Sequence, residues 1–346
     1  MNTYFSKLAG AACAVLCAGA MTSGTAAAAT AVKATAKAAA VTGTIDPVSG
    51  IQTLSGTIKY TYPKVNGTVV PTPDGATFYT ATITVNGVVR SYDVMRPNPA
   101  PASAPMLLLL HPNGTSAEAM TNLTEVAPFL ATQGFWAVMP SAQNGKWNDD
   151  PSNSGDDDVQ FISALISTLT TQGVDASRVY AAGYSNGGFM SERLACQLSS
   201  KIAGFVAVAA TLRNSLATAA QCTPSHVMPV AFIDGTSDLV VPYNGEPSVQ
   251  SAAAATAFWA VKNGCTATAV TTTTLPQTTK DGTTVAQTSF TACPAGSAVD
   301  LYTVNGGGHT WPGSPYSVYT AYLGKTSQNL DATLALWQFL TPYSLK

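Results

Sequence analysis

The segment GYSNGG, residues 183–188, places a serine among glycines directly after the apolar run RVYAA. It matches G-x-S-x-G, in which a sharp turn from a strand into a helix exposes a serine hydroxyl as a nucleophile. The glycines are needed because the turn strains the serine backbone and neighbouring side chains would block the approach of helix to strand. A tight turn selected only for its shape is the alternative, but the flanking pattern favours Ser185 as a nucleophile. The backbone N–H of Asn186 would then face a developing oxyanion.

A serine nucleophile needs a general base, and the chain has three histidines, His111, His226 and His309. On a strand–turn–helix nucleophile the triad follows the chain order serine, acid, histidine, and only His309 leaves room for an acid after Ser185. His309 lies in the glycine-rich segment NGGGHTWPG. We expect His226 to have a surface or packing role, and His111 to hold the loop that follows an apolar strand.

The acid that orients the histidine is expected in the loop after a late strand, within VAFIDGTSDLVVPY. This segment contains Asp234 and Asp238. Asp234 adjoins Gly235 at the end of the strand, which is typical of a turn. Asp238 lies four residues further into the loop and is better placed to reach an imidazole. We therefore predict Asp238 as the acid.

The second oxyanion donor is expected in the loop HPNGTS, which follows the apolar run MLLLL. Pro112 has no backbone N–H, so a later amide must serve. Asn113 is the simplest choice, with Gly114 and Thr115 as alternatives.

Three aromatic residues are candidates for the substrate cleft. Trp311 lies two residues after the predicted base, Tyr243 lies near the predicted acid, and Trp147 is a further candidate whose alternative role is in a lid or in packing. The acidic run at residues 156–158 is interpreted as the first turn of a helix, where carboxylates complement the helix dipole, rather than as a metal site. The sequence predicts neither a metal nor a cofactor.

Strand and helix patterns alternate along the middle of the chain, which predicts an α/β fold with a mostly parallel, doubly wound sheet and helices on both faces. The run MLLLL is continuous, as expected for a strand buried on both faces. Two earlier segments alternate in strand fashion and predict antiparallel strands at the entry to the sheet; these are TLSGTIKYTY and TFYTATITVNGVVRSYDVMRP. Helices are predicted from SAEAMTNLTEVAPFLATQ, DDDVQFISALISTLTTQG, GGFMSERLACQLSS and DATLALWQFL.

The composition is that of a globular protein, with 46% hydrophobic and 10% charged residues in a chain of 346. A formal net charge of −2 without a basic stripe argues against nucleic acid as a partner. Residues 1–29 have the layout of a secretory signal peptide: Lys7, then an apolar run too short to span a bilayer, then small residues. We expect a disordered leader at residues 30–50, a single catalytic domain at residues 51–346, and export to the exterior or periplasm without a membrane anchor.

Four cysteines follow the predicted signal peptide, an even number that favours disulfides in an oxidising compartment. Two Thr-rich, β-prone runs around Asp281-Gly282 separate Cys265 from Cys293, and folding this hairpin would bring the two cysteines together. The remaining pair is Cys196 with Cys222. A zinc site is the alternative, but no CxxC or HxxxH spacing supports it.

Four segments together resemble the secreted polyhydroxybutyrate depolymerase and feruloyl esterase group of the α/β-hydrolase superfamily, over about residues 75–343; they are GYSNGGFMSERLAC, DGTSDLVVPYNG, GGGHTWPG and DATLALWQFL. The resemblance implies the α/β-hydrolase fold and a triad of Ser185, Asp238 and His309. The chain differs from the group in having His-Pro rather than His-Gly after the oxyanion strand. It also has Asp-Gly-Thr rather than His-Gly-Thr before the acid.

The resemblance and the triad together predict a secreted serine ester hydrolase that works through an acyl-enzyme. The resemblance favours poly(3-hydroxybutyrate) or its oligomers as the substrate, with feruloyl or acetyl esters of plant polysaccharide as the alternative. The partner is therefore expected to be a polyester or an ester-decorated polymer. An extracellular binding protein with an inactive site is a further alternative, against which the intact triad argues. Peptidase activity is a third possibility within enzymes.

Overall fold

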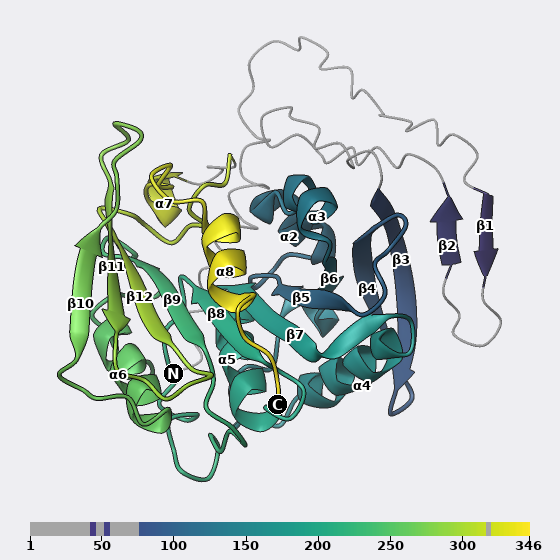
Figure 1. Ribbon diagram of the computed structural model, residues 1–346, viewed down its shortest axis with the longest axis horizontal. Helices are drawn as coiled ribbons and strands as arrows, with labels where there is room; N and C mark the ends of the chain where they lie inside the picture. Colours follow the sequence, from purple (N-terminus) through teal and green to yellow (C-terminus); the bar gives the residue numbers. More distant parts are fainter. Residues whose placement is uncertain (1–41, 46–51, 56–75, 316–319) are drawn as a thin grey trace, which may run out of the picture. The chain divides into compact units, whose positions relative to one another are not determined.

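The computed structural model of the protein describes residues 42–45, 52–55, 76–315 and 320–346. Its centre is a ten-stranded sheet with the strand order β10-β11-β12-β9-β8-β7-β5-β6-β4-β3 (Figure 1). The strands are β3 (Ala76–Val85), β4 (Val88–Pro97), β5 (Ala104–Leu110), β6 (Trp136–Pro140), β7 (Val174–Tyr184), β8 (Gly204–Val208), β9 (Val230–Gly235), β10 (Val270–Thr274), β11 (Thr284–Phe290) and β12 (Val299–Asn305).

The six central strands are parallel, and an antiparallel pair flanks them on each side. The predicted mostly parallel sheet with antiparallel N-terminal strands is therefore confirmed. The chain leaves β5 toward β6 on one side, then returns to build β7, β8 and β9 on the other. The carboxyl ends of β5 and β7 thus lie at the point where the strand order reverses, which is where open α/β sheets form their sites.

Two short strands, β1 (Thr42–Ile45) and β2 (Gln52–Ser55), pair antiparallel with each other. Strand β2 overlaps the start of the predicted strand segment TLSGTIKYTY. Strand β1 falls within the predicted leader, residues 30–50. The predicted signal peptide at residues 1–29 and the remainder of the leader lie outside the described residues, so both stay predictions.

Helices cover both faces of the sheet, as predicted (Figure 1). They are α2 (Ala117–Thr124), α3 (Ala127–Gln133), α4 (Asp158–Thr170), α5 (Asn186–Gln197), α6 (Ala252–Lys262), α7 (Thr320–Leu323) and α8 (Ala332–Leu340), with a short 3₁₀ turn, η1, at Gln143–Gly145. The α4, α5 and α6 helices share one apolar cluster, whereas α2, α3 and α8 share another. Residues of β5 alternate between the two clusters: Leu108 packs into the first and Leu107 into the second. The run MLLLL is therefore buried on both faces.

The predicted helix at residues 116–133 is in fact two helices, α2 and α3. Glu125 has a φ of 46°, a left-handed conformation that ends α2, and a proline opens α3. The elements that the sequence patterns did not identify include α6 and β12. The latter runs parallel to β9 and extends the sheet beyond the predicted strands.

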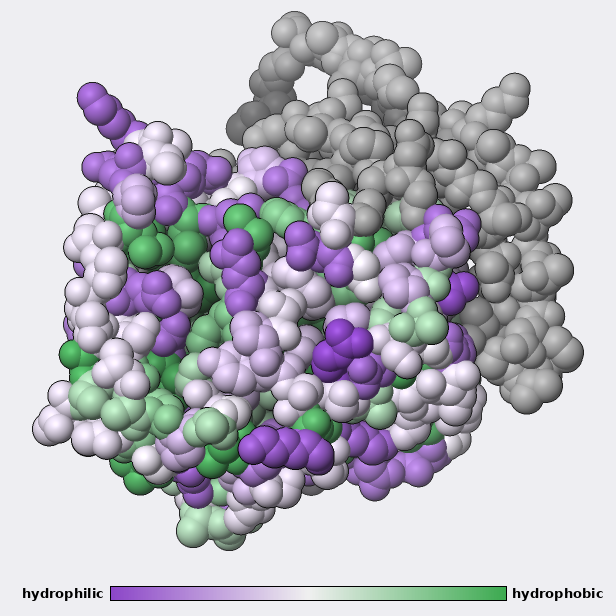
Figure 2. Space-filling view, in the orientation of Figure 1, coloured by the Kyte–Doolittle hydropathy of each residue, from purple (hydrophilic) through white to green (hydrophobic). Residues whose placement is uncertain are grey.

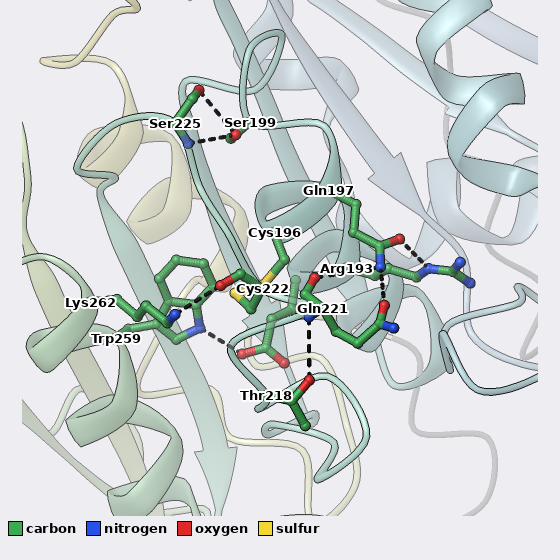
Figure 3. Close-up of a disulfide and its surroundings, with 11 residues drawn as sticks. Arg193, Cys196, Gln197, Ser199, Thr218, Gln221, Cys222, Ser225, Trp259 and Lys262 are labelled. Carbon is green, nitrogen blue, oxygen red and sulfur yellow. Dashed lines mark hydrogen bonds between the residues drawn. A yellow bond between two sulfur atoms is a disulfide. The ribbon is translucent and has the colours of Figure 1, made fainter.

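The two predicted disulfides are confirmed. Cys265–Cys293 closes the antiparallel edge of the sheet, and Cys196–Cys222 joins the last turn of α5 to the segment that follows β8. Figure 3 shows how polar bonds support the second disulfide. Lys262 Nζ donates to the carbonyl of Cys222 at 2.8 Å. The helix that begins at the predicted nucleophile is thus fastened covalently at its other end.

The surface carries little charge. In Figure 2 much of the coloured face is pale, the colour of intermediate hydropathy, and strongly hydrophilic and hydrophobic residues are interspersed across it. This agrees with a sequence in which only 10% of residues are charged. Within the described residues, no helix combines the length and the apolar character that crossing a membrane requires.

Asp93 on β4 provides a test of the core. Its Oδ1 accepts a hydrogen bond from Thr80 at 2.7 Å, its Oδ2 has no partner among the described residues, and burial raises the pKa of Asp93 to about 7. Between the ordinary aspartate pKa and pH 7, the folded protein therefore binds more protons than the unfolded chain. The free energy of unfolding should fall as pH rises across this window, by up to about 1.4 kcal/mol per pH unit from this group.

We predict that Asp93→Asn removes this part of the slope, because an amide does not titrate. Denaturant unfolding of both proteins at pH 5 and pH 7 measures the difference. Equal loss of stability in the two proteins between these pH values would contradict the assignment.

Candidate active site

Ser185 occupies a strained turn between β7 and α5. Its φ of 55° and ψ of −118° lie outside the regions that non-glycine residues ordinarily adopt. Its backbone N–H donates to the carbonyl of Val208 at 2.8 Å, and its own carbonyl accepts from the N–H of Phe189 at 3.1 Å. The sheet and the first turn of α5 therefore hold the strained residue from both sides. This is the elbow that the sequence predicts.

The glycines around Ser185 allow the backbones to pack closely. A Cβ on Gly183 would overlap the carbonyl of Gly187, and a Cβ on Gly187 would overlap the carbonyl of Leu110 at the end of β5. A Cβ on Gly188 would lie 2.7 Å from the side chain of Ala210. The motif therefore needs glycine at these positions, because β5, β7 and α5 pack too closely to leave space for a side chain.

His309 and Asp238 form a buried hydrogen-bonded pair. The distance from His309 Nδ1 to Asp238 Oδ2 is 2.7 Å, and the two residues are 3% and 6% exposed. The other carboxylate oxygen, Oδ1, accepts from the backbone N–H groups of Val240 and Val241 at 2.7 and 2.8 Å. Asp238 is therefore fixed by three N–H groups, one of which belongs to the imidazole.

Tyr184 links the histidine to the elbow. Its hydroxyl donates to the carbonyl of His309 at 2.6 Å, and the centroids of the two rings are 5.2 Å apart. Because Tyr184 directly precedes Ser185, the bond places the His309 loop beside the elbow. The N–H of His309 also donates to the carbonyl of Leu323 in α7 at 2.6 Å. Sequence reasoning missed Tyr184, since a tyrosine in a strand carries no signal of a partner 125 residues away.

Two buried carboxyl groups lie near this pair but have other partners. Asp234 Oδ1 accepts from the N–H of Ala210 at 3.1 Å, and burial together with the charge of Asp238 raises the pKa of Asp234 well above its usual range. Glu192 Oε1 accepts from the indole N–H of Trp259 at 2.7 Å, and burial likewise raises the pKa of Glu192. Burial therefore favours the protonated, neutral form of both side chains.

His111 is a buried neutral imidazole that supports the loop after β5. Its Nε2 accepts from the N–H of Ala142 at 3.0 Å, its Nδ1 donates to the carbonyl of Pro112 at 2.9 Å, and burial lowers its pKa. In this loop the N–H of Gly114 donates to the carbonyl of Gly145 at 2.8 Å. This bond occupies one of the three candidate oxyanion donors. The candidates that remain are Asn113 and Thr115.

Trp147 does not line a substrate cleft, contrary to the sequence-based expectation, because it is completely buried. Its indole N–H donates to the carbonyl of His111 at 3.0 Å. Its backbone N–H donates to Asn186 Oδ1 at 2.7 Å, and its carbonyl accepts from Asn186 Nδ2 at 3.1 Å. Asn186 Nδ2 also donates to Asp149 Oδ1 at 2.7 Å. The sequence singled out Asn186 for its backbone and gave no sign of this side-chain role.

The other two predicted cleft residues differ in exposure. Trp311 is 1% exposed and donates its indole N–H to Thr333 Oγ1 at 3.1 Å, so it is a core residue and the expected substrate contact is wrong for this structure. Tyr243 is partly exposed, and its hydroxyl shares a 2.8 Å hydrogen bond with Thr303. It remains available to a substrate.

The arrangement can support covalent acyl transfer, since it contains a hydroxyl on an elbow, an oriented imidazole and backbone amides at a helix start. Among the side chains that the structure describes, no three His, Cys, Asp or Glu residues are grouped so that they could hold a metal ion.

Comparisons with known proteins give a consistent set of relatives. The family described as Phospholipase/Carboxylesterase matches residues 142–271, which include Ser185 and Asp238. Feruloyl esterase B of Piromyces equi is 33% identical over 221 residues, 60% of this chain and 40% of that protein. The chain thus spans less than half the length of this relative. A putative esterase, NocK, of Nocardia uniformis subsp. tsuyamanensis is 28% identical over 75% of this chain and 81% of its own.

Among solved structures, the acetyl xylan esterase from Aspergillus awamori superposes with a TM-score of 0.51. The alignment covers 71% of this chain and 98% of that enzyme at 14% sequence identity. At this identity the likeness is one of fold.

The close approach of Gly187 to β5 should matter for the stability of the protein. Gly187→Ala should lower the free energy of unfolding by about 2–4 kcal/mol, because the added Cβ meets the backbone of β5, which cannot move without disturbing the sheet. Gly155→Ala is the matched control, since its Cβ would meet only the side chain of Asn148 and should change stability by less than about 1 kcal/mol. Denaturant unfolding measures both. Equal effects at the two positions would show that the close approach does not constrain the elbow.

Proposed function

We propose that this chain, which has the α/β-hydrolase fold, is a carboxylic ester hydrolase with Ser185, His309 and Asp238 as its catalytic triad. The observation that carries the proposal is the buried pair of His309 and Asp238, which Tyr184 joins to the elbow. A buried histidine that is bonded to a fixed carboxylate, beside a serine on a strained turn, has the arrangement of a general base.

In the first step, His309 Nε2 accepts the proton of Ser185 Oγ as the oxygen attacks the carbonyl carbon of the ester. Asp238 holds the imidazole through Nδ1 and stabilises its positive charge. The carbonyl oxygen becomes an oxyanion, which the N–H groups of Asn186 and Asn113 stabilise. Collapse of the tetrahedral intermediate releases the alcohol, which takes the proton from His309, and leaves an acyl group on Ser185.

In the second step, His309 removes a proton from a water molecule, whose oxygen attacks the acyl carbon. The same amides stabilise the second oxyanion. The proton returns from His309 to Ser185 Oγ as the acid leaves, so the enzyme ends in its starting state.

The substrate we propose is a feruloyl or acetyl ester carried by a plant polysaccharide. Its support lies in the relatives, which include feruloyl esterases and a bifunctional acetylxylan esterase/xylanase. These names favour the alternative substrate of the sequence analysis over poly(3-hydroxybutyrate), which is the second candidate because of the resemblance carried by the four motifs.

Two exposed apolar side chains adjoin residues of the site in sequence, and we propose that they contact such a substrate. Leu239 follows Asp238 directly and is 80% exposed. Tyr322 is 61% exposed and directly precedes Leu323, whose carbonyl accepts from the N–H of His309. Large apolar groups at these positions favour binding of an aromatic acyl group or of a polymer chain.

We also propose that the protein is exported. The predicted signal peptide and the two disulfides support this, because disulfides persist in oxidising compartments.

Substitution of the triad tests the proposed mechanism. Ser185→Ala and Asp238→Asn should each lower kcat on p-nitrophenyl acetate by about 10³-fold or more, because the three residues act as a unit. Asp234→Asn is the matched control: Asp234 is about as buried as Asp238 but accepts from the N–H of Ala210 rather than from His309, so an amide of the same shape should leave kcat within about threefold. Circular dichroism confirms folding. Loss of activity in Asp234→Asn with activity retained in Asp238→Asn would contradict the triad.

Release of product from three substrates tests the proposed specificity. Oxidised protein should release ferulate from methyl ferulate or acetate from acetylated xylan faster than 3-hydroxybutyrate from amorphous poly(3-hydroxybutyrate). Ser185→Ala, run beside it, identifies the part of each rate that depends on the nucleophile. Faster Ser185-dependent release from the polyester would overturn the substrate while leaving the triad in place.

A further inference from the structure

Trp147 touches both sides of the proposed oxyanion hole although it is completely buried. One donor, the N–H of Asn186, begins α5 after the elbow. The other, the N–H of Asn113, belongs to the loop after β5. Trp147 belongs to neither segment, yet its indole bonds to His111 at the start of the second segment, and its backbone bonds twice to the side chain of Asn186 in the first.

The geometry points to Trp147 as a positioning residue that fixes the separation of the two oxyanion donors. This rests on the proposed function, since the two amides matter only if an oxyanion forms between them. The indole of Trp147 bonds to the loop after β5, and its backbone N–H and C=O bond to Asn186 at the start of α5. This bridge leaves the two segments little freedom to move relative to each other. Oxyanion donors stabilise the transition state only when they are already held at the right distance, because reorganising them would consume the stabilisation.

The bridge is itself held in place by buried polar groups. Asp149 accepts a hydrogen bond from Asn186 Nδ2 and forms an ion pair with Arg213, which orients the Asn186 amide with its oxygen toward the N–H of Trp147. Asn148, which directly follows Trp147, donates its backbone N–H to Asp158 Oδ2 at 2.7 Å. Asp158 is buried and forms an ion pair with an arginine on β4.

These contacts distinguish positioning from simple packing. A core tryptophan retained only for its volume needs no partner for its indole N–H. Trp136 on β6 is such a residue, since it is equally buried and its Nε1 has no hydrogen-bond partner within the described residues. The chain therefore contains its own control for the substitution of a buried tryptophan by phenylalanine.

The test uses Trp147→Phe, which keeps most of the ring volume and removes the indole N–H, with Trp136→Phe as the matched control. On p-nitrophenyl acetate, kcat of Trp147→Phe should fall about tenfold with KM nearly unchanged, less than the roughly 10²–10³ lost when a donor itself is removed. Trp136→Phe should keep the kcat of the parent. A drop in kcat alone marks an interaction made in the transition state.

An aryl trifluoromethyl ketone gives a readout that reduced folding would not produce. Ser185 Oγ adds to its carbonyl carbon, the hydroxyl proton passes to His309, and the carbonyl oxygen becomes an oxyanion between the two amides. The inhibition constant of Trp147→Phe should rise about as much as kcat falls. The pKa of the adduct hydroxyl, followed by fluorine NMR, should rise as well, because a displaced donor stabilises the oxyanion less.

Asp149→Asn is the second variant, in case Trp147→Phe does not fold. It removes the charge that orients Asn186 and should weaken the inhibitor and lower kcat together. Parent-like kcat and inhibition constant in the folded variants would overturn the inference, as would an equal change in KM and inhibition constant. Failure of the parent protein to form any adduct at Ser185 would instead overturn the proposed function, on which the inference rests.

Discussion

The close approach of three backbone segments, at β5, β7 and α5, is the constraint on which the rest of the site depends. Ser185 adopts a conformation that costs on the order of 1–3 kcal/mol, and it persists because the surrounding sheet determines it. The N–H of Ser185 is bonded to β8, and Gly187 lies against the end of β5 with no space for a side chain. Since these strands are the centre of the core, the direction of the serine hydroxyl is set by the part of the molecule that deforms least. The other site residues need only be brought to this fixed point.

Carboxyl groups of the same chemical type behave differently at this end of the sheet because their surroundings differ. Asp238 is surrounded by three N–H donors, whereas Asp234 accepts from one backbone N–H and is otherwise buried. Burial and the charge of Asp238 raise the pKa of Asp234 and so favour its protonated form. A second carboxylate here would repel the first and would compete for the positive charge that the proposed mechanism develops on His309.

The features that were predictable from the sequence are those fixed by local chain geometry. The elbow follows from glycines at set spacing, the choice of Asp238 over Asp234 from its distance past the strand end, and the Cys265–Cys293 disulfide from a hairpin. The features that were not predictable depend on partners distant in sequence. A tryptophan among polar residues can line a cleft or pack in the core, and the sequence leaves both roles open for Trp147 because its partners lie 36 and 39 residues away. The break between α2 and α3 was not predictable from the sequence because the left-handed residue that ends α2 is Glu125, whereas a glycine is the usual signal for such an end.

Chemistry and substrate choice are separable in this architecture. The groups proposed to handle the proton and the developing charge are buried and are held by the sheet, whereas Leu239 and Tyr322, which adjoin site residues in sequence, are exposed and lie on a loop and a short helix. Substitution of such surface residues changes what an enzyme binds at little cost to its core. The acetyl xylan esterase from Aspergillus awamori shares the fold at 14% sequence identity. If the chain cleaves esters as proposed, we expect the residues that select the ester to lie on the exposed loop after β9 and around α7 rather than among the buried tryptophans.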